Sequence, residues 1–267
     1  MHRTLPLRVT LAILFTAFSS ASTLRGAEPT NQFGFDDFLL VPLRIHLLSA
    51  RVATNLSTTL TEQDIARILP KMNRVWAQAG ITFYLESLLH EEAAGQAGYA
   101  ERARTNEPPA LLTLRPEATR GSNQFHIYYL HQCRPNGIYI GPGGIFVKDT
   151  ASLRKVEGGI DEPLPRVSSH EIGHALTLQH RQDVTNLLAS GTTGIWLNDA
   201  EIRQARDSAR KKPWILPAPE VLRRAEELDR TGETAAARPW FEHLARIPLD
   251  TEQTRRARRR LEETAIR

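Results

Sequence analysis

Cysteine is almost absent from this 267-residue chain, which contains only Cys133. One thiol cannot form an internal disulfide, so the fold must rest on a packed core, and we expect Cys133 to be a partly buried free thiol. A strong charge of one sign is also lacking, because 34 basic and 30 acidic side chains leave a net charge of +4. This small excess does not predict a nucleic-acid-binding surface.

Long apolar runs are missing except near the N-terminus. Residues 1–21 contain Arg3 and Arg8, an apolar run over 9–18 and small residues at 19–21, which is the pattern of a secretory signal peptide. The run is too short to cross a bilayer comfortably, although an uncleaved anchor is the alternative. We therefore expect a secreted or periplasmic protein with no integral membrane segment after signal removal. Removal of residues 1–21 takes away Arg3 and Arg8 and so lowers the net charge from +4 to +2.

The most specific pattern in the chain is the run HEIGH, which begins at His170 and is followed by a third histidine, His180. His170 and His174 are four residues apart, so they lie one turn apart on one face of a helix. Their imidazoles can then reach one Zn²⁺ at about 2.0–2.1 Å. Glu171 stands where a carboxylate can take a proton from a zinc-activated water. His180 can complete the site only if the chain leaves the helix near Thr177.

This spacing resembles the signature HExxHxxGxxH of the metzincin zinc endopeptidases, with Thr177 in the place of the family's glycine. That glycine serves a tight turn with positive φ, which a β-branched residue resists. We therefore expect a differently built turn, with a negative φ at Thr177. The segment Asn186–Leu188 is similar to the family's Asn-Leu-Met turn below the metal, with Leu188 in the methionine place.

The resemblance covers about residues 38–208 and implies an α+β, metzincin-like fold. That fold has a twisted, mixed, mostly parallel sheet with an antiparallel edge strand, two main helices and a short C-terminal subdomain. It also implies a secreted zinc endopeptidase in which a zinc-activated water hydrolyses peptide bonds of a protein or peptide substrate. The implied general base is Glu171, and the implied zinc ligands are His170, His174 and His180.

Two further features of the site follow from the same resemblance. The edge strand near 137–141 either pairs with extended substrate along the cleft or is a plain hairpin. Residues 183–196 are expected to wall the pocket for the substrate side chain after the scissile bond. Ile195 and Trp196 are its expected apolar lining, unless they belong to the core.

Apolar periodicity predicts the order of the elements. Strands are expected at 41–48, 81–88, 124–131, 137–141 and 144–148. Thr58 or Thr61 can cap a first helix, which Pro70 should kink or break. A proline at 163 or 165 opens the helix that carries the histidines, and Asp199 can cap a later one.

We divide the chain into a signal peptide (1–21), an N-terminal arm (22–37), a zinc metalloprotease catalytic domain (38–212) and a helical appendage (213–267). Prolines between 213 and 219 mark a linker. The appendage is similar to a tetratricopeptide-type hairpin, and one such unit is too few for a solenoid. It is either a capping element or a module that binds a protein partner. Its arginines between 255 and 260 are followed by glutamates, which indicates a solvated helix face.

Two other functions fit the same residues. In a gluzincin-like zinc hydrolase, a downstream glutamate replaces the third histidine, and Glu201 is the residue that could do so. The second alternative is a secreted binding protein whose protease domain is degenerate and whose appendage binds a protein partner. The substitutions at Thr177 and Leu188 motivate this alternative.

Overall fold

The computed structural model describes residues 33–105 and 110–265, so the predicted signal peptide and most of the N-terminal arm lie outside the described residues. A sheet in the order β2-β1-β3-β5-β4 forms its centre, and a short strand β6 pairs with the start of β1. Only β4 and β6 run antiparallel to their neighbours. The strands are β1 Leu39–Ser49, β2 Ile81–Glu92, β3 Phe125–Leu130, β4 Gly137–Tyr139, β5 Ile145–Lys148 and β6 Leu216–Pro217. The predicted mixed, mostly parallel sheet with an antiparallel edge strand is confirmed.

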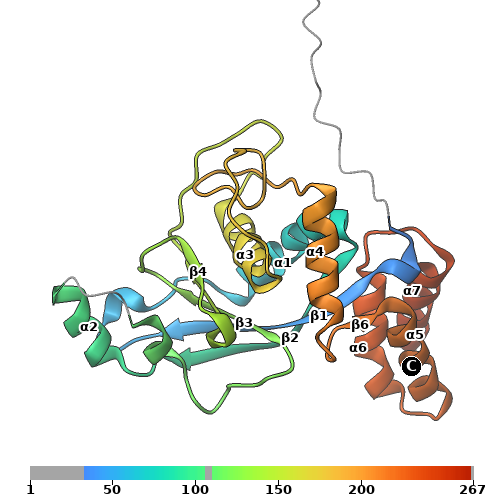
Figure 1. Ribbon diagram of the computed structural model, residues 1–267. Helices are drawn as coiled ribbons and strands as arrows, with labels where there is room; N and C mark the ends of the chain where they lie inside the picture. The colour runs from blue at the N-terminus through green and yellow to red at the C-terminus, as the bar shows by residue number, and fades with distance from the viewer. Residues whose placement is uncertain (1–32, 106–109, 266–267) are drawn as a thin grey trace, which may run out of the picture.

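Two helices cover one face of the sheet (Figure 1). They are α1, Glu62–Trp76, and α3, Pro163–Ala175. Alternate residues of β1, β3 and β5 pack against them, including Ile45, Ile127 and Val147. Intervening residues of the same strands, including Leu48, Tyr128 and Phe146, are buried on the other face with α2 Gln96–Thr105 and the 3-10 helix Leu111–Leu114. The central strands are therefore largely buried on both faces, as in most parallel sheets.

Helix α1 begins at the predicted cap but does not break at Pro70. Thr61 and Asp64 form a reciprocal capping box at its N-terminus. Pro70 is exposed and lies inside a continuous helix of 15 residues, so the helix does not break there. A proline in a helix costs about 3 kcal/mol. The buried side of α1, with Ile68 and Met72 fully covered, offsets this cost.

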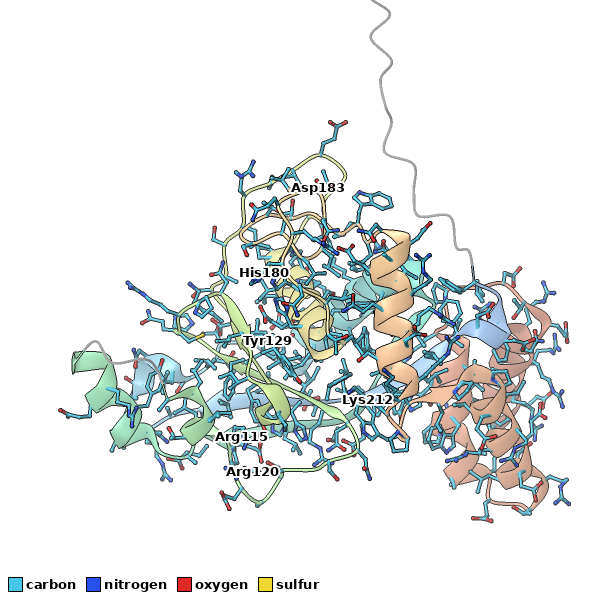
Figure 2. All side chains as sticks on the ribbon, viewed as in Figure 1. Arg115, Arg120, Tyr129, His180, Asp183 and Lys212 are labelled. Carbon is cyan, nitrogen blue, oxygen red and sulfur yellow. The ribbon has the colours of Figure 1, made fainter. Side chains whose placement is uncertain are left out.

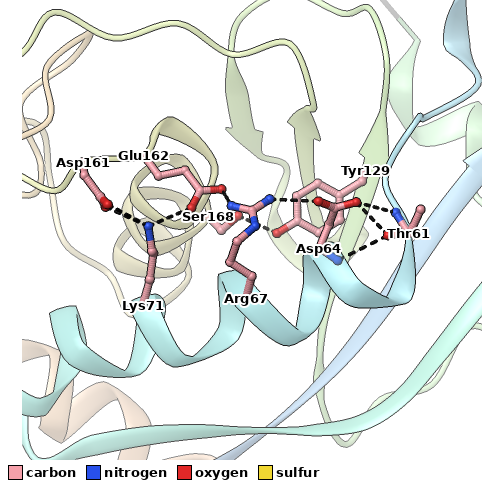
Figure 3. Close-up of polar contacts among 8 residues, drawn as sticks. All are labelled: Thr61, Asp64, Arg67, Lys71, Tyr129, Asp161, Glu162 and Ser168. Atoms are coloured by element: carbon pink, nitrogen blue, oxygen red, sulfur yellow. Dashed lines mark hydrogen bonds and ion pairs between the residues drawn. The ribbon is translucent and has the colours of Figure 1, made fainter.

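Figure 3 shows how α1 is attached to the start of α3 by ion pairs. Arg67 bonds both Asp64 and Glu162, and Lys71 lies between Asp161 and Glu162. These contacts fix the helix that carries the histidine motif against the first helix of the chain. The remaining 3-10 helices are short connectors at Phe35–Asp37, Thr54–Leu56, Ala77–Ala79 and Gly141–Gly143.

Beyond α4, Asp199–Arg210, the chain forms three helices at the opposite end of the sheet from α2 (Figure 1). They are α5 Ala218–Arg230, α6 Thr234–Ala245 and α7 Glu252–Ala265. Their buried residues share a core with Phe35, Phe38 and Leu40. The segment expected as a linker is itself part of the sheet, because β6 pairs with Leu39 and Leu40. No helix in the described ranges is long and apolar enough to span a membrane.

Candidate functional site

The three predicted histidine ligands lie together at the end of α3. Figure 2 shows the position of His180. His174 Nε2 is 3.1 Å from His170 Nε2 and 3.2 Å from His180 Nε2. Tetrahedral coordination with Zn–N bonds of about 2.0–2.1 Å requires neighbouring nitrogens to be about 3.3 Å apart. The spacing of these nitrogens therefore matches three corners of a zinc tetrahedron. No other group of three potential ligands comes together in the described part of the chain.

Carbonyl groups fix the tautomers of two of these histidines. His170 Nδ1 lies 2.8 Å from the oxygen of Leu187, and His174 Nδ1 lies 2.9 Å from that of Leu178. A carbonyl only accepts, so each Nδ1 carries the proton and each Nε2 presents a lone pair to the centre. Lone pairs that face each other at about 3 Å repel unless a cation lies between them. The donor set therefore fits a divalent metal ion such as Zn²⁺.

Burial keeps His170 and His174 uncharged and available as ligands. Burial, with a smaller contribution from the neighbouring Arg166, lowers the pKa of His170 to about 3. Burial also lowers the pKa of His174. Metal ions bind the neutral ring, so both rings are held in the form that a metal requires.

The turn after α3 is the feature that brings His180 back to the cluster. Leu178 N–H donates to Gly173 O and Thr177 N–H donates to His174 O, both at 2.9 Å. These two bonds define a Schellman motif, whose residue after the cap is left-handed. That residue is Thr177, with φ of 72°. The expected negative φ is therefore wrong, and the threonine takes the conformation that glycine normally supplies.

Neighbouring groups hold this strained turn in place. Gln204 on α4 donates to Thr177 O at 2.7 Å, and the Thr177 hydroxyl donates to Leu176 O at 2.6 Å. Among described non-glycine residues, only Thr177 has a positive φ. A left-handed conformation costs a β-branched residue about 1–3 kcal/mol, so packing around the turn must supply that energy.

Glu171 is buried next to His170, the first of the clustered histidines. It is only 5% exposed, and burial raises its pKa to about 7, although Arg166 and a backbone contact from Tyr139 act in the opposite direction. The edge strand β4 packs directly on it. A Cβ on Gly137 would come within 2.4 Å of Val167 and 3.0 Å of Glu171. Only glycine allows β4 to approach the carboxylate so closely.

The segment Asn186–Leu188 lies beneath the histidines, as its resemblance to the family's turn implies. Asn186 Oδ1 accepts from Leu188 N at 2.7 Å, which closes a tight turn. Leu188 is fully buried, and a Cβ on Gly173 would lie 3.2 Å from its side chain. Leu188 therefore fills the space below α3 between the two helical histidines.

Glu201 is not among the clustered metal-binding groups. Its carboxylate accepts from Arg181, from Asn186 Nδ2 at 2.8 Å and from the backbone of Asn198 at 2.9 Å. The last bond is half of a capping box that starts α4 at Asn198, one residue before the expected cap, Asp199. This network holds Glu201 away from the centre, so the gluzincin-like ligand set is not formed.

Arg166 is a residue of the site that the sequence analysis missed. It is 2% exposed and lies one helical turn before His170, with Nη1 3.0 Å from His170 Nδ1. Its guanidinium donates to the carbonyls of Gly194, Asn186 and Ala189. The sequence did contain a signal for its role, because this arginine lies four residues before the predicted ligand His170 on the buried side of a short apolar helix.

Residues 183–196, which were expected to wall a substrate pocket, contribute to two separate cavities. A pocket of about 300 Å³ begins directly after His180 and is lined by Asp183, Asn186 and Trp196 among others. Ile195 does not line it. Ile195 lines a larger cavity of about 1050 Å³ on the outer side of α1, and Trp196 lines both cavities.

Three solved structures show distant similarity to this chain. No family model and no curated protein matches the chain. A structure of mirolysin with compound 9 is 11% identical, covers 64% of this chain and 91% of its own, and has a TM-score of 0.43. A Tannerella forsythia promirolysin mutant is 12% identical, with coverages of 66% and 82% and a TM-score of 0.41. A chaperone–substrate complex is 11% identical, with coverages of 66% and 38% and a TM-score of 0.39. Similarity at this level does not assign the chain to a family.

Proposed function

We propose that this chain is a secreted zinc-dependent endopeptidase. The observation that carries the proposal is the cluster of three inward-facing Nε2 atoms next to the buried Glu171. His170, His174 and His180 would hold the ion. When bound, zinc supplies a Lewis acid that polarises a carbonyl oxygen and makes water at the site more acidic. The resemblance of the histidine spacing to metzincins supports the same assignment.

Glu171 performs the proton transfers in this proposal. Its buried carboxylate accepts a proton from the attacking water and gives it to the leaving amine nitrogen. A pKa near neutrality suits both steps, since the group must take and release the proton at similar pH. The edge strand β4 lies against Glu171 and can pair with an extended substrate backbone.

Metal binding is tested by elemental analysis and zinc titration of the purified protein. We expect about one zinc per chain, and a loss of affinity of at least about 10-fold in His180→Ala, because one of three ligands is removed. Glu201→Gln is the matched comparison, since this carboxylate belongs to a different network. Unchanged affinity in His180→Ala would reject the three-histidine site.

The role of Glu171 is tested by hydrolysis of a mixed peptide library. Glu171→Ala should lower turnover by about 10²–10⁴, the usual contribution of general acid–base catalysis, while zinc remains bound. A zinc-loaded wild-type chain that cleaves no peptide would favour the alternative of a binding protein with a degenerate protease domain.

A further inference from the structure

A second site lies on the outer side of α1, away from the histidines. It is a cavity of about 1050 Å³ between α1 and β2, which is also lined by the loops at 158–159 and 195–196 and by Arg246 and Pro248. Its walls are largely apolar and include Ile65, Leu69, Leu85 and Leu88. We call this cavity the α1–β2 groove. Glu171 and the three histidines do not line it.

The floor of the groove is an open sheet edge. β2 is the outermost strand, with β1 as its only strand neighbour among the described residues. At Phe83, the Asn73 side chain donates to the backbone oxygen at 3.0 Å and accepts from the backbone N–H at 2.7 Å. This is the pair of hydrogen bonds that a neighbouring strand would make. From Tyr84 to His90, the described residues provide no such partner on the outer edge.

Two arginines and one glutamate are the charged residues that line the groove. Figure 3 shows Arg67 and Lys71 of α1 satisfied by acidic side chains. Arg74, further along α1, and Arg246, after α6, are both exposed. Among the described residues, no carboxylate lies within 4 Å of either guanidinium. The acidic residue that lines the groove, Glu62, lies 3.6 Å from His90. The groove therefore offers two guanidinium groups beside an apolar wall.

We propose that the α1–β2 groove binds an extended acidic segment of a partner protein as an additional strand on β2. The backbone of the segment continues the pairing that Asn73 begins at Phe83, with Leu85 as the next residue facing the same edge. Alternate apolar side chains of the segment pack on Leu69 and Leu85, and its carboxylates reach Arg74 and Arg246. This site goes beyond the proposed peptidase activity and does not depend on it.

The test measures binding of a fluorescein-labelled peptide, Thr-Val-Thr-Val-Thr-Val-Glu-Glu, to the full chain carrying Glu171→Gln, which prevents cleavage of the probe. We expect saturable binding that weakens by at least about 10-fold in the double variant Arg74→Glu, Arg246→Glu. The same variant should gain affinity for a probe that ends in Lys-Lys. Ala66→Trp should also weaken binding, because Ala66 is exposed and its side chain lines the groove.

Arg203→Glu is the matched control, because Arg203 is exposed on α4 and does not line the groove. A probe methylated on alternate backbone nitrogens cannot pair with a strand and should bind at least about 10-fold more weakly. The proposal fails if the Arg74→Glu, Arg246→Glu variant binds the acidic probe as tightly as its parent. It also fails if binding appears only after residues 22–32 are removed, since the chain's own arm would then occupy the groove. A change from dimer to monomer in that variant would assign the groove to a second copy instead.

Discussion

A single residue, Thr177, determines whether the third histidine can reach the other two. The sequence predicted that the chain must leave the helix at this position, and the structure places a Schellman turn there. It did not reveal the sign of φ, because the intrinsic preference of threonine argues against a left-handed turn. The bonds from Gln204 and to Leu176 come from tertiary structure and outweigh that preference.

The observed φ of 72° at Thr177 predicts the effect of replacing it with glycine. Glycine removes about 1–2 kcal/mol of left-handed strain but adds about 0.4–1 kcal/mol of unfolded-state entropy. We expect Thr177→Gly to raise the free energy of unfolding by about 0.5–1 kcal/mol. Denaturant unfolding of the wild type and the variant, both saturated with zinc, measures this change in the free energy of unfolding. Thr177→Ala is the control, since it removes the hydroxyl without relieving the strain, and a destabilised glycine variant would show that the turn is not strained.

At the scale of elements, apolar periodicity predicted most of the sheet and both main helices. Buried alternate residues in β1 and β3 leave a strong pattern, and Thr61 and Asp64 mark the start of α1. The pattern cannot show whether the burial of Ile68 and Met72 offsets the cost of Pro70 in the helix, because that burial depends on the rest of the fold. The same limit concealed Arg166, whose carbonyl acceptors lie 20 or more residues away in the sequence.

Arg166 joins α3 to the turn beneath the histidines, which makes its replacement a test of that connection. The described residues provide it with carbonyl acceptors and no carboxylate within ion-pair distance. Arg166→Met keeps the apolar length but leaves those carbonyls without their donor. We expect a loss of about 3 kcal/mol or more in the free energy of unfolding, since each bond to a charged group contributes about 1.5–3 kcal/mol.

Urea unfolding of zinc-saturated protein checks this expectation, and Arg166→Lys should retain part of the stability because one charged donor remains. Arg154→Met, at an exposed position, serves as the matched control. A loss below about 1 kcal/mol in Arg166→Met would mean that the turn does not depend on the guanidinium.

At the scale of the whole molecule, the helical appendage is joined to the sheet through more than its predicted linker. β6 extends the sheet beside β1, and Phe38 and Leu40 bury against α5 and α6. Tyr84 of β2 stacks on His243 of α6, with ring centroids 4.1 Å apart. The sequence predicted these helices from their own periodicity. It could not show that residues about 160–200 positions apart share one core, because each segment alone is an ordinary amphipathic element.

The stacked His243 makes the attachment of the appendage sensitive to acid. Burial lowers its pKa to about 4, with a smaller effect from Arg246, and its Nδ1 has no hydrogen-bond partner among the described residues. The unfolded chain takes up this proton near pH 6.5, whereas the folded chain resists it until about pH 4. Stability from this group is therefore complete above about pH 6.5 and is lost as the pH falls toward about 4.

His243→Phe keeps an aromatic ring against Tyr84 and removes the titration. We expect the wild type to lose about 2–3 kcal/mol more than this variant when the pH falls from about 7 to about 4, because each unit of pKa shift corresponds to about 1.4 kcal/mol. Denaturant unfolding of both proteins at each pH gives the difference. Other buried histidines, such as His46, titrate equally in both proteins and cancel. Equal losses in the two proteins would show that His243 is not held neutral by its burial, and that the appendage stays attached by its apolar core alone.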